Sequence, residues 1–355
     1  MPVKSGHVSV LGGLARLVIL SVVVGALLYG ALRFTGLIGS ADDYYGSGSG
    51  SVEVVVPPGA TGVQIGEVLE DDGVVKTAEA FYRESLGDER SAMIQPGKYR
   101  LRMHMSSEAA IDALLDPTNR IETRIVVPEG SRVSEIVAAI VKGSDINEDD
   151  LKDALNNPEE IGLPDEADGN PEGYLFPATY TVEDGMSAKD LLRQMVARTV
   201  DVEEELNLDR RAAAIDMSAE QVLTVASILE YEARRDEDYP KVARVLYNRL
   251  DEDIPLQLDS TVSYVSKRKG DVWTTQLERA DPSGYNTYQH IGLPPGPIGS
   301  PGRKTIEAAL NPADGNWLYF FADKQGVTHF NRSFDNHVAQ CRKAYGTSKD
   351  GACGG

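Results

Sequence analysis

One glutamate of the sequence lies where a carboxyl group could transfer protons. Glu230 ends the apolar run VLTVASILE, which predicts a helix. At about 100° per residue it falls on the margin of the apolar stripe, above Leu223 and Ala226. A carboxylate at this margin loses hydration, which raises its pKa and lets it donate a proton near neutral pH. The same spacing also allows Glu230 to turn to solvent or to pair with Arg234 one turn later.

A second segment, PEGYLFPATYTV, combines a carboxyl group with aromatic side chains. Glu172 lies in a tight turn between a proline and a glycine. Tyr174, Phe176 and Tyr180 have the same parity, so a regular strand would place them on one face. Aromatic faces stack on sugar rings and also build protein cores. Both a sugar-binding face and a core strand therefore fit this segment.

A third segment, PLQLDSTVSY, alternates apolar and polar residues, which predicts a strand. Its polar face would carry Gln257, Asp259 and Thr261. A row of amide, carboxylate and hydroxyl groups suits the hydroxyl and N-acetyl groups of a sugar. It suits a solvated sheet surface equally well.

A fourth segment, YNTYQHIGLPPGPIGSPG, starts with polar and aromatic residues and continues with closely spaced prolines and glycines. This composition predicts a rigid, irregular loop. We expect the loop to form the wall of a cleft rather than a plain connection. Its candidate binding residues are Tyr285, Asn286, Thr287, Tyr288 and Pro294.

The elements that hold these segments are predicted from capping residues and apolar spacing. Ser218 and Gln221 have the spacing of a capping box at the start of the helix that contains ASILE. Residues 186–208 are predicted to form a helix with Ser187 as its N-cap. Residues 317–330 are predicted to form a hairpin.

The chain also contains an internal repeat, in which VVPPG returns as VVPEG. The apolar residues Ile65 and Leu69 of the first copy match Ile136 and Ile140 of the second. Each copy is typical of a strand, a turn and a helix. Units of this shape resemble LysM-type glycan-binding modules, although the same pattern also serves packing alone.

The N-terminal region contains a candidate membrane span. Residues 17–38 are mostly apolar and carry no charge apart from Arg33, and a span of about 20 residues crosses a bilayer if this arginine extends to the interface. Lys4 and Arg16 precede the span, so the positive-inside rule places the N-terminus in the cytoplasm. A signal peptide cleaved near residues 39–41 is the competing interpretation.

Charge and cysteine content exclude some functions. The 355 residues carry a net charge of −20, which argues against a nucleic acid partner because phosphates require Lys and Arg. Cys341 and Cys353 are too few for a disulfide scaffold, and they form either one bond or two free thiols. The sequence has no zinc-binding pattern, phosphate loop or HExxH motif, so we expect no metal and no cofactor.

Several motifs, taken in order, resemble the endolytic murein transglycosylase family, also called the MltG or YceG-like family. They are PEGYLFPATY, ASILEYEA, VLYNRL, PLQLDSTVSY and YNTYQHIGLPPGPI, followed by Asn311-Pro312 and LYFFAD. The resemblance extends over roughly residues 51–345.

The resemblance implies an activity and a catalytic residue. Members of the family cut the β-1,4 bond between N-acetylmuramic acid and N-acetylglucosamine inside peptidoglycan strands, without water, and leave a 1,6-anhydro end. Their catalytic glutamate lies in the motif matched by ASILE, which gives Glu230 the role of general acid and then base. The chain departs from the family at Ala178, where many relatives have Asp, and we expect that position to be peripheral. The resemblance also implies association with peptidoglycan synthases.

The sequence thus predicts an α+β protein with one membrane helix. The predicted parts are a cytoplasmic tail (1–16), a transmembrane helix (17–38), a linker (39–50), a LysM-like α+β subdomain (51–121), a second strand-turn-helix unit with its connection (122–165), a mixed α+β catalytic domain (166–345) and a disordered tail (346–355). We expect a single-pass protein of the inner (cytoplasmic) membrane, with its N-terminus in the cytoplasm and its catalytic domain in the periplasm.

Two other functions compete with this one. A hydrolytic muramidase needs a second carboxylate to activate water. Glu172 could supply it, whereas Glu232 points about 160° away from Glu230 around the helix. The other alternative is a membrane-anchored scaffold that binds peptidoglycan without cutting it.

Overall fold

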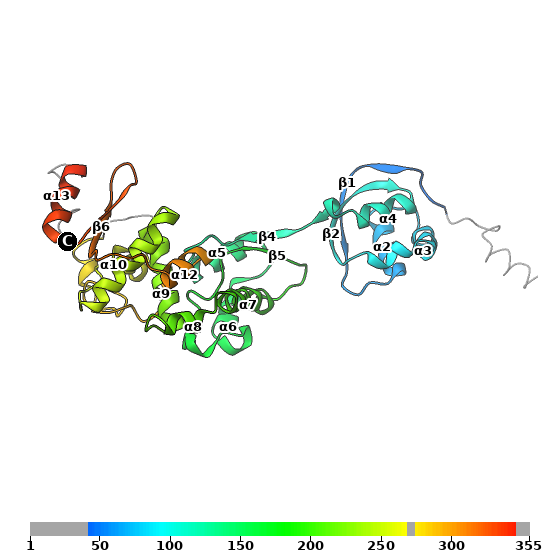
Figure 1. The fold of residues 1–355 in the computed structure, drawn as a ribbon. Coiled ribbons are helices and arrows are strands. Elements are labelled where there is room, and N and C mark those ends of the chain that lie inside the picture. The colour runs from blue at the N-terminus through cyan, green and yellow to red at the C-terminus, as the bar shows by residue number, and fades with distance from the viewer. Residues whose placement is uncertain (1–41, 268–273, 346–355) are drawn as a thin grey trace, which may run out of the picture. The chain divides into compact units, whose positions relative to one another are not determined.

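The computed structural model of the chain describes residues 42–267 and 274–345 (Figure 1). The chain divides between Glu122 and Thr123 into two compact units, which are described separately. Helices combine with three small antiparallel sheets, and this confirms the mixed α+β class.

The first unit is a three-stranded sheet covered by helices. Its elements are β1 (Ser47–Val56), α2 (Gly62–Asp71), α3 (Ala78–Gly87), η1 (Glu89–Met93), β2 (Gly97–Met105), α4 (Ser107–Leu115), η2 (Pro117–Asn119) and β3 (Arg120–Ile121). The strand order is β1-β2-β3, with both pairs antiparallel. Tyr99 and Leu101 of β2 are buried while Arg100 and Arg102 are exposed, so one face of the sheet packs on the helices.

The start of β1 corrects one prediction. Residues 46–50 were expected to belong to a Gly/Ser linker, but Ser47 and Ser49 pair with Met105 and Met103 of β2. The pairing is irregular beyond Ser49, and Gly48 has a positive φ of 69°. A Cβ at Gly48 would lie only 2.4 Å from the carbonyl oxygen of Met103. Glycine therefore permits this close approach of two strands, which composition alone does not reveal.

The second unit is mainly helical. Its elements are β4 (Thr123–Val126), α5 (Val133–Gly143), α6 (Glu148–Leu155), η3 (Pro158–Ile161), η4 (Asp165–Ala167), β5 (Thr179–Val182), α7 (Ala188–Leu206), α8 (Leu208–Ala213), α9 (Ala219–Glu232), η5 (Asp236–Asp238), α10 (Tyr239–Asp251), α11 (Asp259–Val265), η6 (Glu278–Ala280), α12 (Arg303–Leu310), β6 (Tyr319–Ala322), β7 (Thr328–Asn331) and α13 (Phe334–Tyr345). β4 pairs with β5, so the segments predicted as 122–165 and 166–345 share a sheet.

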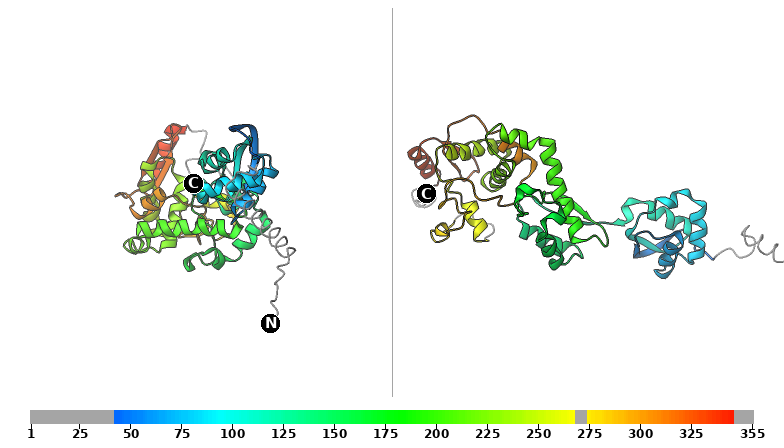
Figure 2. Two further views of the ribbon diagram at one scale, coloured as in Figure 1. Left: turned by 90° about the vertical axis from the view of Figure 1, so that its right-hand side faces the viewer. Right: turned by 90° about the horizontal axis from the view of Figure 1, so that it is seen from below.

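The C-terminal elements of this unit lie side by side in both sets of views (Figures 1 and 2). β6 and β7 form the predicted hairpin, and α13 packs against it. Cys341 of α13 is buried and is not a free thiol, while Cys353 lies outside the described residues.

The internal repeat is confirmed in backbone detail. In each copy a strand leads into a turn with a glycine of positive φ, 72° at Gly59 and 75° at Gly130. A helix follows in each copy, and the side chain of its third residue accepts a hydrogen bond from the backbone before it, as at Gln64 and Glu135. The matched apolar residues are buried: Ile65, Leu69, Ile136 and Ile140.

α9 is the central helix of the second unit. All residues from Val222 to Leu229 are buried, and α10 and α12 pack against it. Ser218 and Gln221 form the predicted capping box, and Ser187 caps α7 as predicted. A helix that is buried on all sides needs partners on all sides, and the surrounding helices supply them.

The strand predicted for PLQLDSTVSY is not formed. Residues 255–258 are irregular, and helix α11 begins at Asp259. Gln257 has a positive φ of 54°, and its backbone N–H donates to the carbonyl of Thr287 in the neighbouring loop. A residue with positive φ breaks the alternation of a strand, so Gln257, Asp259 and Thr261 do not share one sheet face.

The predicted membrane helix at 17–38 and the tail at 346–355 lie outside the described residues. Within residues 42–267 and 274–345, no helix is long and apolar enough to cross a membrane.

Substitutions at the adjacent residues Ile140 and Val141 test which side of α5 packs in the core of the second unit. Ile140 is fully buried on α5, whereas Val141 is 38% exposed. We expect Ile140→Ala to lower the free energy of unfolding by about 2–5 kcal/mol, because it leaves a cavity. Val141→Ala should cost less than about 1 kcal/mol. Urea unfolding followed by circular dichroism measures both, and equal effects would contradict this assignment of the core.

Candidate active site

Glu230 lies near the C-terminal end of α9, where three segments of the second unit meet. α12 packs against α9, and the irregular loop before α12 runs past the glutamate. The turn between β4 and α5 approaches from another direction: a Cβ on Gly130 would lie 3.4 Å from the Cβ of Glu230. The side chain of Glu230 is only partly exposed as a result.

The carboxylate of Glu230 binds the N-terminus of α12. Its Oε1 accepts a hydrogen bond from the backbone N–H of Gly302 at 2.8 Å and another from the hydroxyl of Thr305 at 2.6 Å. Gly302 is the residue before the helix, so the carboxylate satisfies a backbone donor that the helix leaves unpaired. Oε2 has no hydrogen-bond partner in the part of the chain that the structure describes. Arg234, the alternative partner considered from the sequence, is not bonded to Glu230 there.

Some neighbours of Glu230 raise the pKa of its carboxyl group and others lower it. Burial raises the pKa of its carboxyl group, and the hydrogen bonds from Thr305 and Gly302 lower it. The negative charges of Glu129 and Asp236 raise it further, so the pKa lies above its ordinary value. A carboxyl group with a raised pKa and donors aimed at its anion can serve both as an acid and as a base.

The loops beside Glu230 are held by backbone hydrogen bonds. Gly130 N–H donates to Ser300 O and Ser300 N–H donates to Ser131 O, both at 2.8 Å. Ile298 N–H donates to the hydroxyl of Ser227 inside α9 at 3.0 Å. A Cβ on Gly299 would lie 2.6 Å from Gly130 O, so this contact requires glycine. Two chain segments far apart in sequence are thereby fixed against the helix that carries the glutamate.

Glu172 forms a second buried acidic site in the same unit. Its Oε1 accepts from Val133 N–H at the start of α5 at 3.0 Å, and its Oε2 accepts from the hydroxyl of Tyr264 at 3.2 Å. Burial raises the pKa of Glu172 to about 7, against the lowering effect of these bonds and of Arg132. Glu172 thus joins the segment PEGYLFP to α5 and α11.

Arg132 connects this cluster to the neighbourhood of Glu230. Its guanidinium lies over the rings of Tyr231 and Tyr264, 5.9 and 5.4 Å from their centroids. It also donates to Ser263 O at 3.2 Å. Tyr231 follows Glu230 directly, is 38% exposed, and donates its hydroxyl to Gly130 O at 2.5 Å. An exposed ring thus lies beside the candidate acid.

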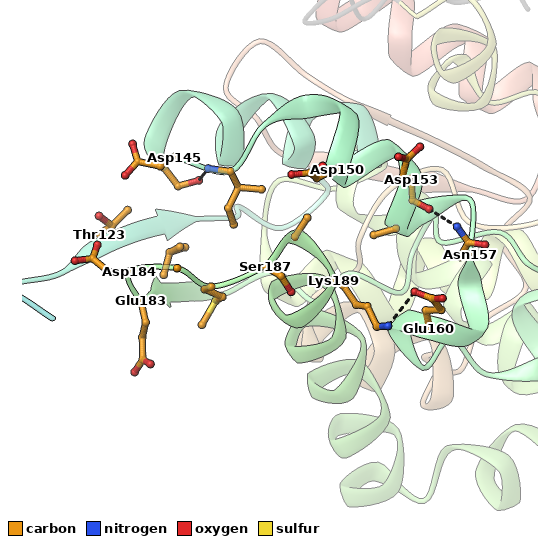
Figure 3. A pocket seen from close by; sticks show the side chains of 17 residues that line it. Thr123, Asp145, Asp150, Asp153, Asn157, Glu160, Glu183, Asp184, Ser187 and Lys189 are labelled. Carbon is orange, nitrogen blue, oxygen red and sulfur yellow. Dashed lines mark hydrogen bonds and ion pairs between the residues drawn. The ribbon is translucent and has the colours of Figure 1, made fainter. Parts of the chain in front are cut away.

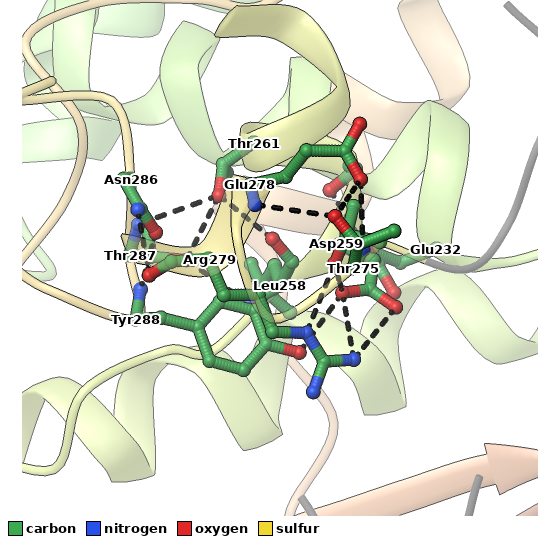
Figure 4. A network of polar contacts seen from close by, with 12 residues as sticks. Glu232, Leu258, Asp259, Thr261, Thr275, Glu278, Arg279, Asn286, Thr287 and Tyr288 are labelled. Atoms are coloured by element: carbon green, nitrogen blue, oxygen red, sulfur yellow. Dashed lines mark hydrogen bonds and ion pairs between the residues drawn. The ribbon is translucent and has the colours of Figure 1, made fainter. Parts of the chain in front are cut away.

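Several predicted binding residues meet in one polar network around Asp259 (Figure 4). The carboxylate of Asp259 accepts from Tyr288 at 3.0 Å and from Arg279 at 3.1 Å. Thr261 and Thr287 share a hydrogen bond of 2.9 Å. The structure therefore brings these segments together, although through a helix start and a loop instead of a strand.

Glu232 lies at another part of the same network (Figure 4). Its Oε1 accepts from the hydroxyl of Ser260 at 2.6 Å. Burial raises the pKa of Glu232 to about 7, and the charge of Asp259 also raises it. Glu230 and Glu232 thus contact different elements, as their angular separation on the helix predicts.

Burial changes the interpretation of the remaining candidates. Tyr174, Phe176 and Tyr180 do not form one aromatic face: Tyr174 and Phe176 precede β5 and lie in a different core cluster from Tyr180. Thr261, Asn286, Thr287 and Pro294 are also buried. These side chains therefore support the fold in this conformation. Contact with a ligand stays a prediction for the candidates with exposed surface, Gln257, Asp259, Tyr285 and Tyr288.

The sequence did not single out five residues that surround Glu230. They are Glu129, Arg132, Tyr231, Gly302 and Thr305. A signal existed only for the first, because the second copy of the repeat has Glu where the first has Pro. The others become functional candidates only through contacts between distant segments.

Glu230 lines neither of two cavities found among the described residues. A cavity of 380 Å³ lies between β4, α6 and the start of α7, and its lining includes Asp145, Asp150, Asp184 and Lys189 (Figure 3). A second, of 310 Å³, lies against β2 and β3 in the first unit. The described residues contain no cluster of His, Cys, Asp and Glu that could hold a metal ion. The chemistry of the carboxyl group, not cavity size, therefore identifies the candidate site.

Comparison with known proteins gives consistent matches. Residues 54–343 match the YceG-like family. The chain is 32% identical over 321 residues to the endolytic murein transglycosylase of Bacillus subtilis, covering 84% of this chain and 86% of that protein. It is 27% identical over 325 residues to the protein of the same name in Streptococcus pneumoniae serotype 2, covering 81% and 57%. A crystal structure of a yceG-like protein of Listeria monocytogenes is similar with a TM-score of 0.56 and 29% identity, covering 82% of this chain and 99% of that one.

A substitution at Thr305 tests how far its hydroxyl group lowers the pKa of Glu230. We expect Thr305→Val to raise the pKa of Glu230, because it removes a donor that stabilises the carboxylate. A titration followed by the carboxyl carbon signal in NMR measures this value. Thr305→Ser keeps the hydroxyl and should leave the pKa near that of the unchanged protein. An unchanged pKa in Thr305→Val would contradict the role of this bond.

The raised pKa of Glu172 predicts a pH dependence of stability. Its pKa is about 7 in the fold and about 4.3 in the unfolded chain, so the folded state binds the proton more tightly. The resulting stability is fully present below about pH 4 and is lost as the pH rises through about 7. Relative to Glu172→Gln, the free energy of unfolding should fall by about 3 kcal/mol between these limits. Parallel pH profiles for the two proteins would contradict the prediction.

Proposed function

Because the chain belongs to the YceG-like family, we propose that it is an endolytic murein transglycosylase. In this proposal it is a lyase that cuts the β-1,4 bond between N-acetylmuramic acid and N-acetylglucosamine within peptidoglycan strands. The cut leaves 1,6-anhydro-muramic ends. The single observation that carries the mechanism is the environment of Glu230, a partly buried carboxyl group with a raised pKa and one oxygen bound at a helix N-terminus.

Glu230 performs two proton transfers in this mechanism. In its protonated form it donates a proton to the glycosidic oxygen while the bond from that oxygen to the anomeric carbon of muramic acid breaks. The carboxylate then accepts the proton of the muramic 6-hydroxyl group while the oxygen of that group bonds to the anomeric carbon. The proton count on Glu230 is restored, and no water is consumed.

The N-terminus of α12 assists the first transfer. Once Glu230 has given up its proton, the N–H of Gly302 and the hydroxyl of Thr305 stabilise the negative charge on Oε1. These donors are already in place before the reaction, so the protein does not reorganise to supply them. Oε2, which lacks a partner among the described residues, is the oxygen that we assign to proton exchange with the substrate.

We extend the proposal to the parts before the second unit. The β1-α2-α3-β2 order within the first unit, in which β1 and β2 pair in antiparallel fashion, supports a LysM-like module that holds glycan. The apolar residues 17–38 support a single membrane anchor with the catalytic unit in the periplasm. Association with peptidoglycan synthases is proposed on family resemblance alone.

Replacing Glu230 tests the mechanism directly. Glu230→Gln keeps the size and one oxygen of the side chain but cannot deliver the proton. We expect the rate of strand cleavage by the full chain to fall by about 100- to 10,000-fold on purified peptidoglycan. Separation of the released fragments by chromatography measures the rate.

Glu307→Gln is the matched control. Glu307 lies on α12 with 48% of its side chain exposed, and it pairs only weakly with Arg303, at 3.9 Å. This variant should cut at the rate of the unchanged protein. If Glu230→Gln, folded by circular dichroism, cut as fast as Glu307→Gln, the assignment of Glu230 would be wrong.

A further inference from the structure

Two carboxyl groups meet at one glycine beside the proposed catalytic residue. Gly302 N–H donates to Glu230, while the side chain of Glu129 occupies the space that a side chain on Gly302 would need. A Cβ there would lie 2.1 Å from Oε1 of Glu129 and 2.5 Å from its Cδ. The mechanism above gives Glu129 no task, and neither the repeat nor the motifs explain its position.

The turn that carries Glu129 is held on both sides. Val127 N–H donates to Ala178 O at 2.9 Å before it, and Gly130 N–H donates to Ser300 O at 2.8 Å after it. The hydroxyl of Ser131 donates to Pro128 O at 2.6 Å and closes the turn. Glu129 itself makes no hydrogen bond or ion pair within the described residues, and its side chain is exposed. Its position therefore follows from the backbone and not from a charged partner.

The charged groups near Glu230 on η5 and α12 have ion-pair partners among the described residues. On η5, Asp236 accepts from Lys304 of α12 at 2.5 Å, so these two charges offset each other. Arg303 of α12 is bound to Glu205. Tyr239 of α10 also lies near the Glu230 carboxyl group. Its phenol is neutral at ordinary pH, because burial and the nearby carboxylates raise its pKa to about 12. Among these charged groups of the described residues, Glu129 is the one that has no ion pair or hydrogen bond, although Lys304 also interacts with its charge.

We propose that Glu129 is a positioning residue for Glu230. Held across Gly302, its negative charge keeps the proton on Glu230 until the leaving oxygen takes it. Gly302 has no side chain because two carboxyl groups must approach each other there. This inference rests on the proposed function and adds to it a second acidic residue that acts through the first.

Burial is the largest cause of the raised pKa of Glu230, and Glu129 is the larger of the two charge effects. Removing the charge of Glu129 stabilises the ionised form of Glu230 and so lowers its pKa. The acid is active when protonated, so activity is lost as the pH rises through that value. The alkaline limb of the pH profile must therefore move to lower pH when the charge is removed.

Glu129→Gln tests this in the full chain. We expect the alkaline limb of kcat/KM on purified peptidoglycan to move down by about half a pH unit to one unit, a three- to tenfold loss above the limb. Gly302→Ala should move it in the same direction, since the new methyl group displaces Glu129 but leaves the backbone donor. Glu307→Gln should leave the profile unchanged. A uniform loss at every pH, or no change in either variant, would overturn the proposal.

A second measurement separates this proposal from the proposed function. NMR titration of the Glu230 carboxyl group, assigned by its absence in Glu230→Gln, reports its pKa without any substrate. A lower pKa in Glu129→Gln supports the proposal even if the protein fails to cut peptidoglycan, which would refute the function alone. An unchanged pKa overturns the role of Glu129 even if Glu230 proves catalytic.

Discussion

The hydrogen bonds from Gly302 and Thr305 to Glu230 are the interaction on which the site depends. A glutamate on the inner helix of a mainly apolar unit would ordinarily be costly, because burial penalises its charge. The N-terminus of α12 reduces this cost by supplying a backbone donor that the helix itself leaves unpaired. The same bonds fix the carboxyl group in one direction. One contact between α9 and α12 thus both stabilises the buried carboxyl group and orients it for proton transfer.

This contact needs the loops around it to come very close. Gly299 allows two backbone segments to pass within a distance that any side chain would block, Gly130 takes a positive φ of 75° in the facing turn, and Gly302 leaves room for Glu129. The prolines and glycines of the last loop therefore do more than connect helices. They determine how closely the loop before α12 packs against the turn between β4 and α5 beside Glu230. Tyr231 and Arg132 contact each other next to this turn.

The local parts of this structure could be predicted from the sequence, and the contacts between distant parts could not. Capping residues and apolar spacing identified the starts of α7 and α9 and the repeat, because these depend on near neighbours. The strand prediction was wrong at Gln257, because this residue has a positive φ and its backbone N–H donates a hydrogen bond to Thr287 in another loop. Glu129 went unnoticed because its significance arises only from Gly302, far along the chain. Alternation alone also did not separate buried aromatic residues from exposed ones.

The central claim is that one carboxyl group carries the reaction and that no water enters it. The full chain can digest purified peptidoglycan in water labelled with oxygen-18, and mass spectrometry can identify the new ends. The account predicts 1,6-anhydro ends without the heavy oxygen, since the muramic 6-hydroxyl group supplies the incoming oxygen. Reducing ends that carry the label would contradict it, because they would require a hydrolase in which a second carboxylate activates water.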